Sequence, residues 1–149
     1  MPRVLRLALA LVLLAALAIG TVASTSAGGP KILDARMTGI PTAGLVIDGV
    51  TGGGLPWVLD SGHAKLFADG RLEVEVEGLV LVRDGTNPVT SGHAIVTCNG
   101  APAATSPNVP FSPSGDATVT TQVDLPASCL APAIFFTTAT DRWLAVTGF

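Results

Sequence analysis

"GHAKLFADGRLEVEVEG" (residues 62–78) decides the fold class, because apolar and polar residues alternate on both sides of one Asp-Gly pair. Alternation with a period of two is typical of a β-strand that buries one face. An Asp-Gly pair between two such runs is a strong signal for a β-hairpin. The segment therefore predicts two antiparallel strands, at 62–67 and 71–82.

The length of the turn decides which side chains share a face of this hairpin. A two-residue turn would place apolar residues of one strand opposite glutamates of the other. A three-residue loop over 68–70 places Leu66 opposite Leu72, and the charged side chains then gather on the other face. We therefore predict a type I turn in which Asp69 is followed by Gly70 in the left-handed conformation, with a G1 bulge.

The far end of the second strand is apolar on both faces. The same alternation turns Gly78, Val80 and Val82 inward, so that Leu79 and Leu81 point outward. Two outward leucines form an apolar patch that either lies under a loop or binds a partner.

The chain beyond residue 27 consists of short runs rich in β-branched residues, separated by Gly, Pro, Asn and Asp. No segment has the apolar spacing of an amphipathic helix over three turns. Further strands are expected at 31–37, 44–48, 57–60, 92–98, 116–125, 133–139 and 142–148. We predict an all-β fold, an immunoglobulin-like antiparallel β-sandwich of about seven to nine strands, with a small β-barrel as the alternative.

Two segments are too rich in Gly or Pro to be regular strands. "DGVTGGGLPW" (48–57) lacks the pattern of a phosphate-binding loop and is expected to be a flexible loop. "APAATSPNVPFSPSG" (101–115) carries four prolines and is expected to be a long connection, with at most a short edge strand at 103–105. The loops 48–56 and 101–115 are our candidate contact regions.

The first 27 residues have the layout of a secretory signal peptide. Arg3 and Arg6 precede an apolar run over 7–19, and small residues then offer cleavage after Ala23 or Ala27. An uncleaved segment that tethers the protein to a membrane is the alternative. The mature chain, 28–149, is expected to be one secreted domain.

The charge of the mature chain limits its partners. Six of the eight basic residues remain against eleven acidic ones, a net charge of about −5. Without a basic cluster, we expect no nucleic-acid partner and no membrane contact after cleavage. The expected partner is a protein or a surface ligand of unknown identity, and the sequence does not indicate an oligomeric state.

Cys98 and Cys129 are the only cysteines of the chain. An even count in an exported chain predicts a disulfide, which would close a loop of about 30 residues. Two buried free thiols are the alternative.

The chain's two histidines, His63 and His93, each lie in the four-residue sequence S-G-H-A, which occurs at 61–64 and at 91–94. A metal site would need a third ligand such as Glu75. The alternation instead turns both imidazoles outward, so we expect solvated surface residues, no metal and no other cofactor.

Asp60, Ser61 and His63 together do not make a catalytic triad. Along an extended chain Ser61 and His63 point to one side and Asp60 points to the other, so that Asp60 cannot orient the imidazole. We find no other catalytic motif. A secreted metal-assisted or hydrolytic enzyme that uses His63, His93 and a carboxylate is the alternative hypothesis.

"GHAKLFADGRLEVEVEGL" (62–79) resembles the CHRD domain, a secreted β module, in its G-x-A…DG-x-L-x-V-x-V-x-G-L pattern. That family continues with a histidine-rich A-H-I-H segment, where this chain reads "VLVRDGTNPV" (80–89), so no functional residue carries over. The mature layout is also similar to small secreted bacterial β-sandwich proteins of unknown function, through "LPWV" (55–58), "DGTNPV" (84–89), "CNG" (98–100) and "PFSP…CLAP" (110–113 and 129–132). This likeness implies no activity. We therefore expect an exported, non-catalytic binding or structural module.

Overall fold

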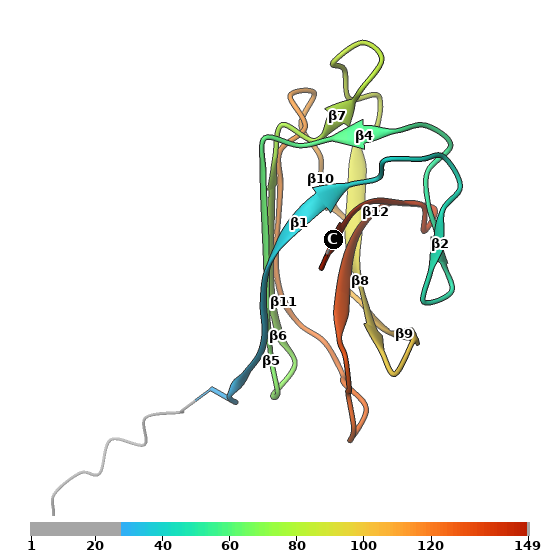
Figure 1. Ribbon diagram of the computed structural model, residues 1–149. Helices are drawn as coiled ribbons and strands as arrows, with labels where there is room; N and C mark the ends of the chain where they lie inside the picture. Colours follow the sequence, from blue (N-terminus) through green and yellow to red (C-terminus); the bar gives the residue numbers. More distant parts are fainter. Residues whose placement is uncertain (1–27, 149) are drawn as a thin grey trace, which may run out of the picture.

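The protein is built around a single curled antiparallel sheet (Figure 1). The structure is a computed structural model and describes residues 28–148. Nine strands form it in the order β10-β8-β12-β13-β1-β5-β6-β11, with β9 also beside β8. These strands are β1 (Lys31–Gly39), β5 (Ser61–Phe67), β6 (Arg71–Glu77), β8 (Ser91–Cys98), β9 (Ala101–Thr105), β10 (Val109–Pro110), β11 (Ala117–Gln122), β12 (Ala133–Thr138) and β13 (Trp143–Thr147).

Two small two-stranded sheets complete the fold. They are β2 (Val46–Ile47) with β3 (Val50–Thr51), and β4 (Trp57–Val58) with β7 (Val80–Leu81). The all-β antiparallel class is confirmed. Residues 28–148 contain thirteen strands rather than seven to nine, because five of them are only two residues long. The described part of the chain includes no helix that is long and apolar enough to cross a membrane. The expected signal peptide and its cleavage sites lie outside the described residues.

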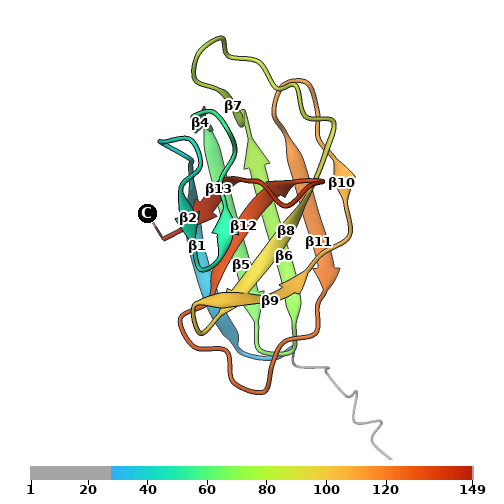
Figure 2. The ribbon, with the colours of Figure 1, turned by 90° about the vertical axis from the view of Figure 1, so that its right-hand side faces the viewer.

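Strand β1 belongs to both halves of the sheet. Residues 31–36 pair with β5, and Met37–Gly39 pair with β13. The sheet curls around this strand until β5, β6 and β11 face β8, β12 and β13, whose strands cross them obliquely in Figure 2. We call the first group the front half and the second the back half. The core lies between the two halves.

The front half buries one face only, and the back half buries both. In β5 and β6 five apolar residues are buried, namely Ala64, Leu66, Leu72, Val74 and Val76, and all other residues, Phe67 included, are partly or fully exposed. In β13 all five residues are buried, and in β8 seven of eight are. This difference follows the sequence, because β5 and β6 alternate strictly, whereas "AIFFTT" and "WLAVT" offer bulky apolar side chains to both faces.

The predicted hairpin register is confirmed. Leu66 lies opposite Leu72, and His63 lies opposite Glu75. Gly70 has a φ of +89° and its N–H donates to the Phe67 carbonyl at 2.9 Å.

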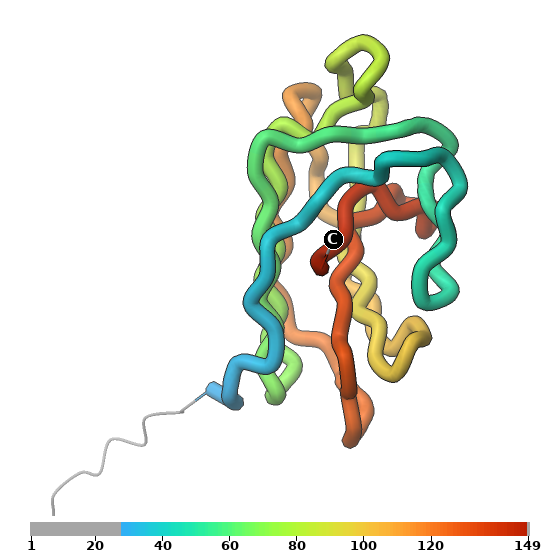
Figure 3. The backbone as a smooth tube through the Cα atoms, viewed as in Figure 1, coloured from blue at the N-terminus to red at the C-terminus, as the bar shows by residue number. Residues whose placement is uncertain are grey.

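The segment 40–56 covers the outer face of the back half, as the backbone path in Figure 3 shows. Its β2–β3 hairpin turns at Asp48 and Gly49, which both have positive φ. The Trp143 indole N–H donates to the Leu45 carbonyl at 3.0 Å, and the Gly53 N–H donates to the Trp143 carbonyl at 2.9 Å. The segment 48–57, expected to be a flexible loop, contains β3 and the first residue of β4, and a Cβ on Gly52 would overlap the Ile40 side chain.

Leu79 and Leu81 do not form an exposed patch, so of the two alternatives for these leucines the covered one is observed. Strand β6 ends at Glu77, and Gly78 has a φ of +63°, which breaks the alternation. Leu79 and Leu81 become buried, whereas Val82 is 59% exposed. The loop that holds this break is 112–116, because the Leu79 N–H donates to the Gly115 carbonyl and the Gly78 N–H donates to the Asp116 carboxylate.

The proline-rich segment 101–115 contains more strand than expected. β9 and β10 both pair with β8, and Ser106 between them exchanges hydrogen bonds with the Ala94 backbone. Pro102 and Pro110 lie in these edge strands, the positions in a sheet that accommodate proline. The predicted disulfide between Cys98 and Cys129 is confirmed, and it ties the end of β8 to the connection between β11 and β12.

Replacing Gly70 by Val tests the turn. A Cβ at this position would overlap the Val123 carbonyl oxygen, and the residue would also be held at positive φ. We expect a loss of about 3–4 kcal/mol in the free energy of unfolding, a severe effect for one substitution. The measurement is urea unfolding of the mature chain. Gly44→Val is the control, because Gly44 has a φ of +69° but open space around it, and we expect it to lose only about 1–2 kcal/mol. Equal losses in the two variants would contradict the steric argument.

Acidification tests the Asp116 loop. Hydrogen bonds from the Ser114 hydroxyl, the Gly78 N–H and the Ser112 hydroxyl lower the pKa of Asp116 from its usual 3.8. A lowered folded-state pKa stabilises the fold above the unfolded-state pKa, and this contribution disappears as the pH falls through the folded-state value. We therefore expect the stability difference between the wild type and Asp116→Asn to shrink from pH 7 to pH 3.

Asp124→Asn is the matched control for this experiment, because Asp124 is exposed and no hydrogen bond of its carboxylate is found within 28–148. Its stability difference from the wild type should change less over the same pH range. A gap between the wild type and Asp116→Asn that is equal at both pH values would contradict the prediction.

Candidate functional site

His63 lies on the outer face of the front half, as expected. Its side chain is 43% exposed, and its Nε2 lies 2.5 Å from Asp34 Oδ1. Hydrogen bonds from Lys31 and then from His63 lower the pKa of Asp34. The structure brings His63 together with Glu75, since the two are cross-strand partners and both line an open hollow of about 520 Å³.

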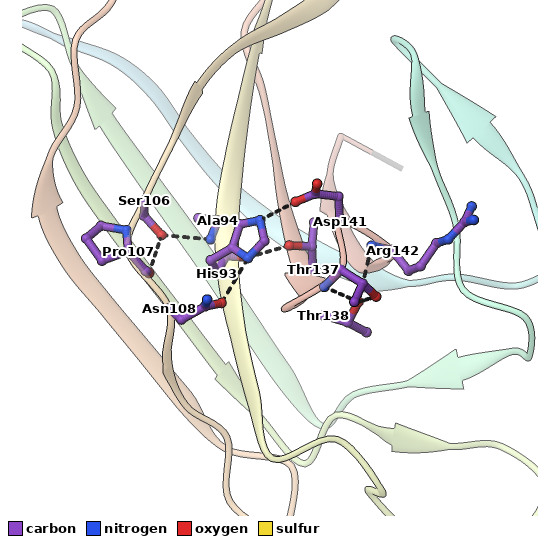
Figure 4. Close-up of polar contacts among 10 residues, drawn as sticks. His93, Ala94, Ser106, Pro107, Asn108, Thr137, Thr138, Asp141 and Arg142 are labelled. Atoms are coloured by element: carbon purple, nitrogen blue, oxygen red, sulfur yellow. Dashed lines mark hydrogen bonds and ion pairs between the residues drawn. The ribbon is translucent and has the colours of Figure 1, made fainter.

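His93 is buried, so its expected position at the surface is wrong. Only 4% of the residue is exposed. Figure 4 shows its ring between two oxygens: Nδ1 lies 3.1 Å from Asn108 Oδ1, and Nε2 lies 2.9 Å from Asp141 Oδ1. The alternation was right that this side chain leaves the central core. The outer face of the back half is not solvent, however, because other segments cover it.

The two histidines do not share a site. In the sheet, β5 and β8 are separated by β1, β13 and β12, and the two imidazoles lie on the outer faces of opposite halves. No group of three or more His, Cys, Asp or Glu side chains that could hold a metal ion occurs within residues 28–148. The combination of His63, His93 and Glu75 is therefore not brought together.

The His93 side chain ties two loops to the sheet. A neutral imidazole has one N–H, so it can donate to only one of its two oxygen neighbours. The Asp141 oxygen is near Nε2 but outside hydrogen-bond geometry, so that contact is an ion pair when the ring carries both protons. Asp141 itself has a φ of +60°, which is uncommon for a residue other than glycine. The contacts of His93 thus hold the segment before β10 and the β12–β13 turn in a fixed arrangement.

A groove opens beside this turn. Its first hollow, of about 450 Å³, is lined by residues 49–51 of the hairpin, by Ile95, by Pro102 and Thr105 of β9, and by residues 140–142. Its second hollow, of about 320 Å³, has an apolar floor; it is lined by Gly53, Gly54, Leu55, Trp57, Leu81, Arg83, Pro88, Thr138, Thr140, Arg142 and Leu144. Thr140 and Arg142 line both hollows. We call the two together the hairpin groove.

The hairpin groove joins both predicted contact loops. Residues 49–55 and residues 102 and 105 come from the two loops that the sequence indicated. Sequence reasoning missed Asp141, Arg142 and Trp57. The residues around the turn, "TATDRW" (138–143), carry no motif that could have indicated a site. Trp57 offered only its rarity, since the chain has two tryptophans.

Comparison with known proteins found no relative: no family model, no curated protein and no solved structure matches the chain. A function therefore has to be argued from the geometry and chemistry of the site.

Removing the His93 side chain tests its structural role. His93→Ala removes the contacts to Asn108 and Asp141 and leaves a cavity, so we expect a loss of about 2–4 kcal/mol in the free energy of unfolding. His63→Ala is the matched control and should lose at most about 1 kcal/mol, because its ion pair with Asp34 is exposed. Urea unfolding of both variants measures the difference. Equal losses would mean that His93 does not hold the two loops.

Proposed function

We propose that this chain is an exported, non-catalytic binding module that holds its ligand in the hairpin groove. The observation that carries the proposal is the convergence of three distant segments, 49–51, 102–105 and 140–142, on the first hollow, which shares Thr140 and Arg142 with the second. Ligand sites are typically such concavities, with an apolar floor and a few polar groups.

The two walls of the groove, the β2–β3 hairpin and the β12–β13 turn, are fixed to the back half by hydrogen bonds and an ion pair. The hairpin is anchored through Asp48, whose carboxylate accepts from the Thr97 hydroxyl at 2.9 Å, and through the Trp143 indole. The turn is anchored by the Thr138 N–H, which donates to the Arg142 carbonyl at 2.8 Å, and by Asp141 at His93. A groove with fixed walls loses little conformational entropy on binding, which favours recognition.

Export is supported by the N-terminal pattern of charge and apolar residues and by the disulfide, which is compatible with an oxidising compartment. An immunoglobulin-like relationship, with binding through loops at the ends and flanks of strands, remains part of the proposal. The resemblance to CHRD and to small secreted bacterial proteins supports export and adds no ligand.

A ligand screen on the mature chain tests the proposal. We would record ¹H–¹⁵N spectra with oligosaccharides, short peptides, nucleotides, small carboxylates and lipid vesicles. We expect at least one class to shift the amides of Val50, Ile95 or Thr105 in the first hollow, or of Gly53, Gly54 or Leu55 in the second. For a ligand of the first hollow, Thr105→Arg should weaken binding at least about 10-fold, or about 1.4 kcal/mol.

Thr120→Arg is the control for this screen. Thr120 is exposed on β11, on the outer face of the front half, so its replacement adds the same charge away from the groove. Equal effects of the two variants would overturn the assignment of the groove. Turnover on a substrate panel without any saturable binding at the groove would overturn the proposal as a whole.

A further inference from the structure

The two tryptophans of the chain differ in how their indole N–H groups are satisfied. The Trp143 N–H donates to the Leu45 carbonyl. The Trp57 N–H has no hydrogen-bond acceptor within residues 28–148, although only 6% of the residue is exposed. A buried indole N–H usually has a partner, so Trp57 has an unused donor.

This donor faces the second hollow of the hairpin groove. Trp57 and Gly53 both line that hollow, and a Cβ on Gly53 would lie 3.6 Å from Trp57 Nε1. Among residues 28–148, only Arg71 Nε and His93 Nε2 are side-chain nitrogens that are both fully buried and without a hydrogen-bond partner. Trp57 Nε1 has no partner but is not one of these two atoms, so it is partly accessible from outside. Glycine at position 53 thus leaves the indole N–H uncovered.

The charged side chains that line this hollow are both cationic. Arg142 is exposed and makes no ion pair with a carboxylate in the described part of the chain. Arg83 pairs through Nε with Asp84 at 2.8 Å, but its side chain is 66% exposed and its other donors remain available. No Asp or Glu lines the hollow. A ligand there meets two guanidinium groups and no carboxylate of the lining, and Asp84 offsets part of the charge of Arg83 only.

The floor of the same hollow is apolar. Leu81 and Leu144 are buried beneath it, and Leu55 at its rim is 38% exposed. Its volume of about 320 Å³ lies near the lower end of small-molecule pockets, which span roughly 300–1,000 Å³. An occupant therefore needs a compact apolar part beside its anionic group.

We propose that the second hollow binds a carboxylate with a small apolar substituent. The carboxylate accepts from the Trp57 N–H and the Arg142 guanidinium, with Arg83 adding charge, and the substituent packs on Leu55, Leu81 and Leu144. A free small carboxylate and the carboxyl terminus of a peptide with an apolar last residue share this chemistry. The assignment rests on the proposed binding function and names the ligand class for half of the groove.

The indole region of a ¹H–¹⁵N spectrum of the mature chain tests this directly. The two tryptophans give two indole signals, and Trp57→Phe assigns them. Titration with N-acetyl-leucine should shift the Trp57 signal in a saturable way and leave the Trp143 signal in place. N-acetyl-leucine amide, which lacks the charge, should bind at least about fivefold more weakly.

Charge variants provide the second arm. Arg142→Gln should weaken binding of N-acetyl-leucine at least about fivefold, whereas Arg36→Gln, which removes an exposed arginine from the outer face of the front half, should not. Thermal unfolding confirms that both variants fold. The inference is overturned if the Trp57 signal does not move at millimolar ligand, or if the two arginine variants weaken binding equally.

The source of the carboxylate is decided by a third comparison. Tighter binding of acetyl-Ala-Ala-Leu than of N-acetyl-leucine supports a peptide terminus, and equal binding together with binding of hexanoate supports a free carboxylate. Binding of another ligand class at Ile95 with a silent Trp57 would overturn this inference and leave the proposed function standing. The absence of saturable binding anywhere in the groove would remove both.

Discussion

The anchoring of segment 40–56 on Trp143 is the constraint on which the rest of the structure depends. Strands β12 and β13 present large apolar side chains to both faces, and Phe135 and Trp143 pack edge to face with their ring centroids 5.9 Å apart on the outer one. Without a cover these rings would face water, at a cost of about 25 cal/mol for each Å² of apolar surface. The cover is a short chain with little core of its own, so it depends on close contact. Glycines at 52 and 53 allow that contact.

The same cover creates the hairpin groove. Because the hairpin is laid across the back half and not paired at its edge, it leaves room beside β9 and beside the β12–β13 turn. The turn cannot collapse into this room, since Asp141 is held at His93 and the Thr138 N–H bonds to the Arg142 carbonyl. Stability and concavity therefore have one origin: the layer that buries Trp143 also forms a wall of the groove.

The sequence predicted well wherever the information was local. The period of two and the Asp-Gly pair were enough for the register of β5 and β6, including the left-handed Gly70. The predictions failed where further segments cover the outer face of the sheet. Alternation shows only that a side chain points away from the central core. It does not show what lies over the other face. The position of His93 was predicted wrongly for that reason. The alternation also failed at Leu79, because it breaks at Gly78, whose conformation depends on contacts with the distant loop at 112–116. The groove itself joins segments far apart in the chain, so no local pattern could have indicated Arg142.

The two S-G-H-A copies show how the layer, and not the local sequence, decides a residue's role. Each histidine follows glycine near the start of a strand, precedes a buried alanine and leaves the central core. His63 lies on the outer face of the front half, which is exposed to water. Its ion pair with Asp34 is therefore exposed and adds little to the free energy of unfolding. His93 emerges beneath other segments, where an unpaired polar ring would be costly, and Asn108 and Asp141 are both placed against it. The same four-residue sequence thus places a solvated histidine in the front half and a buried histidine in the back half. The buried histidine, His93, holds the β12–β13 turn that forms one wall of the groove.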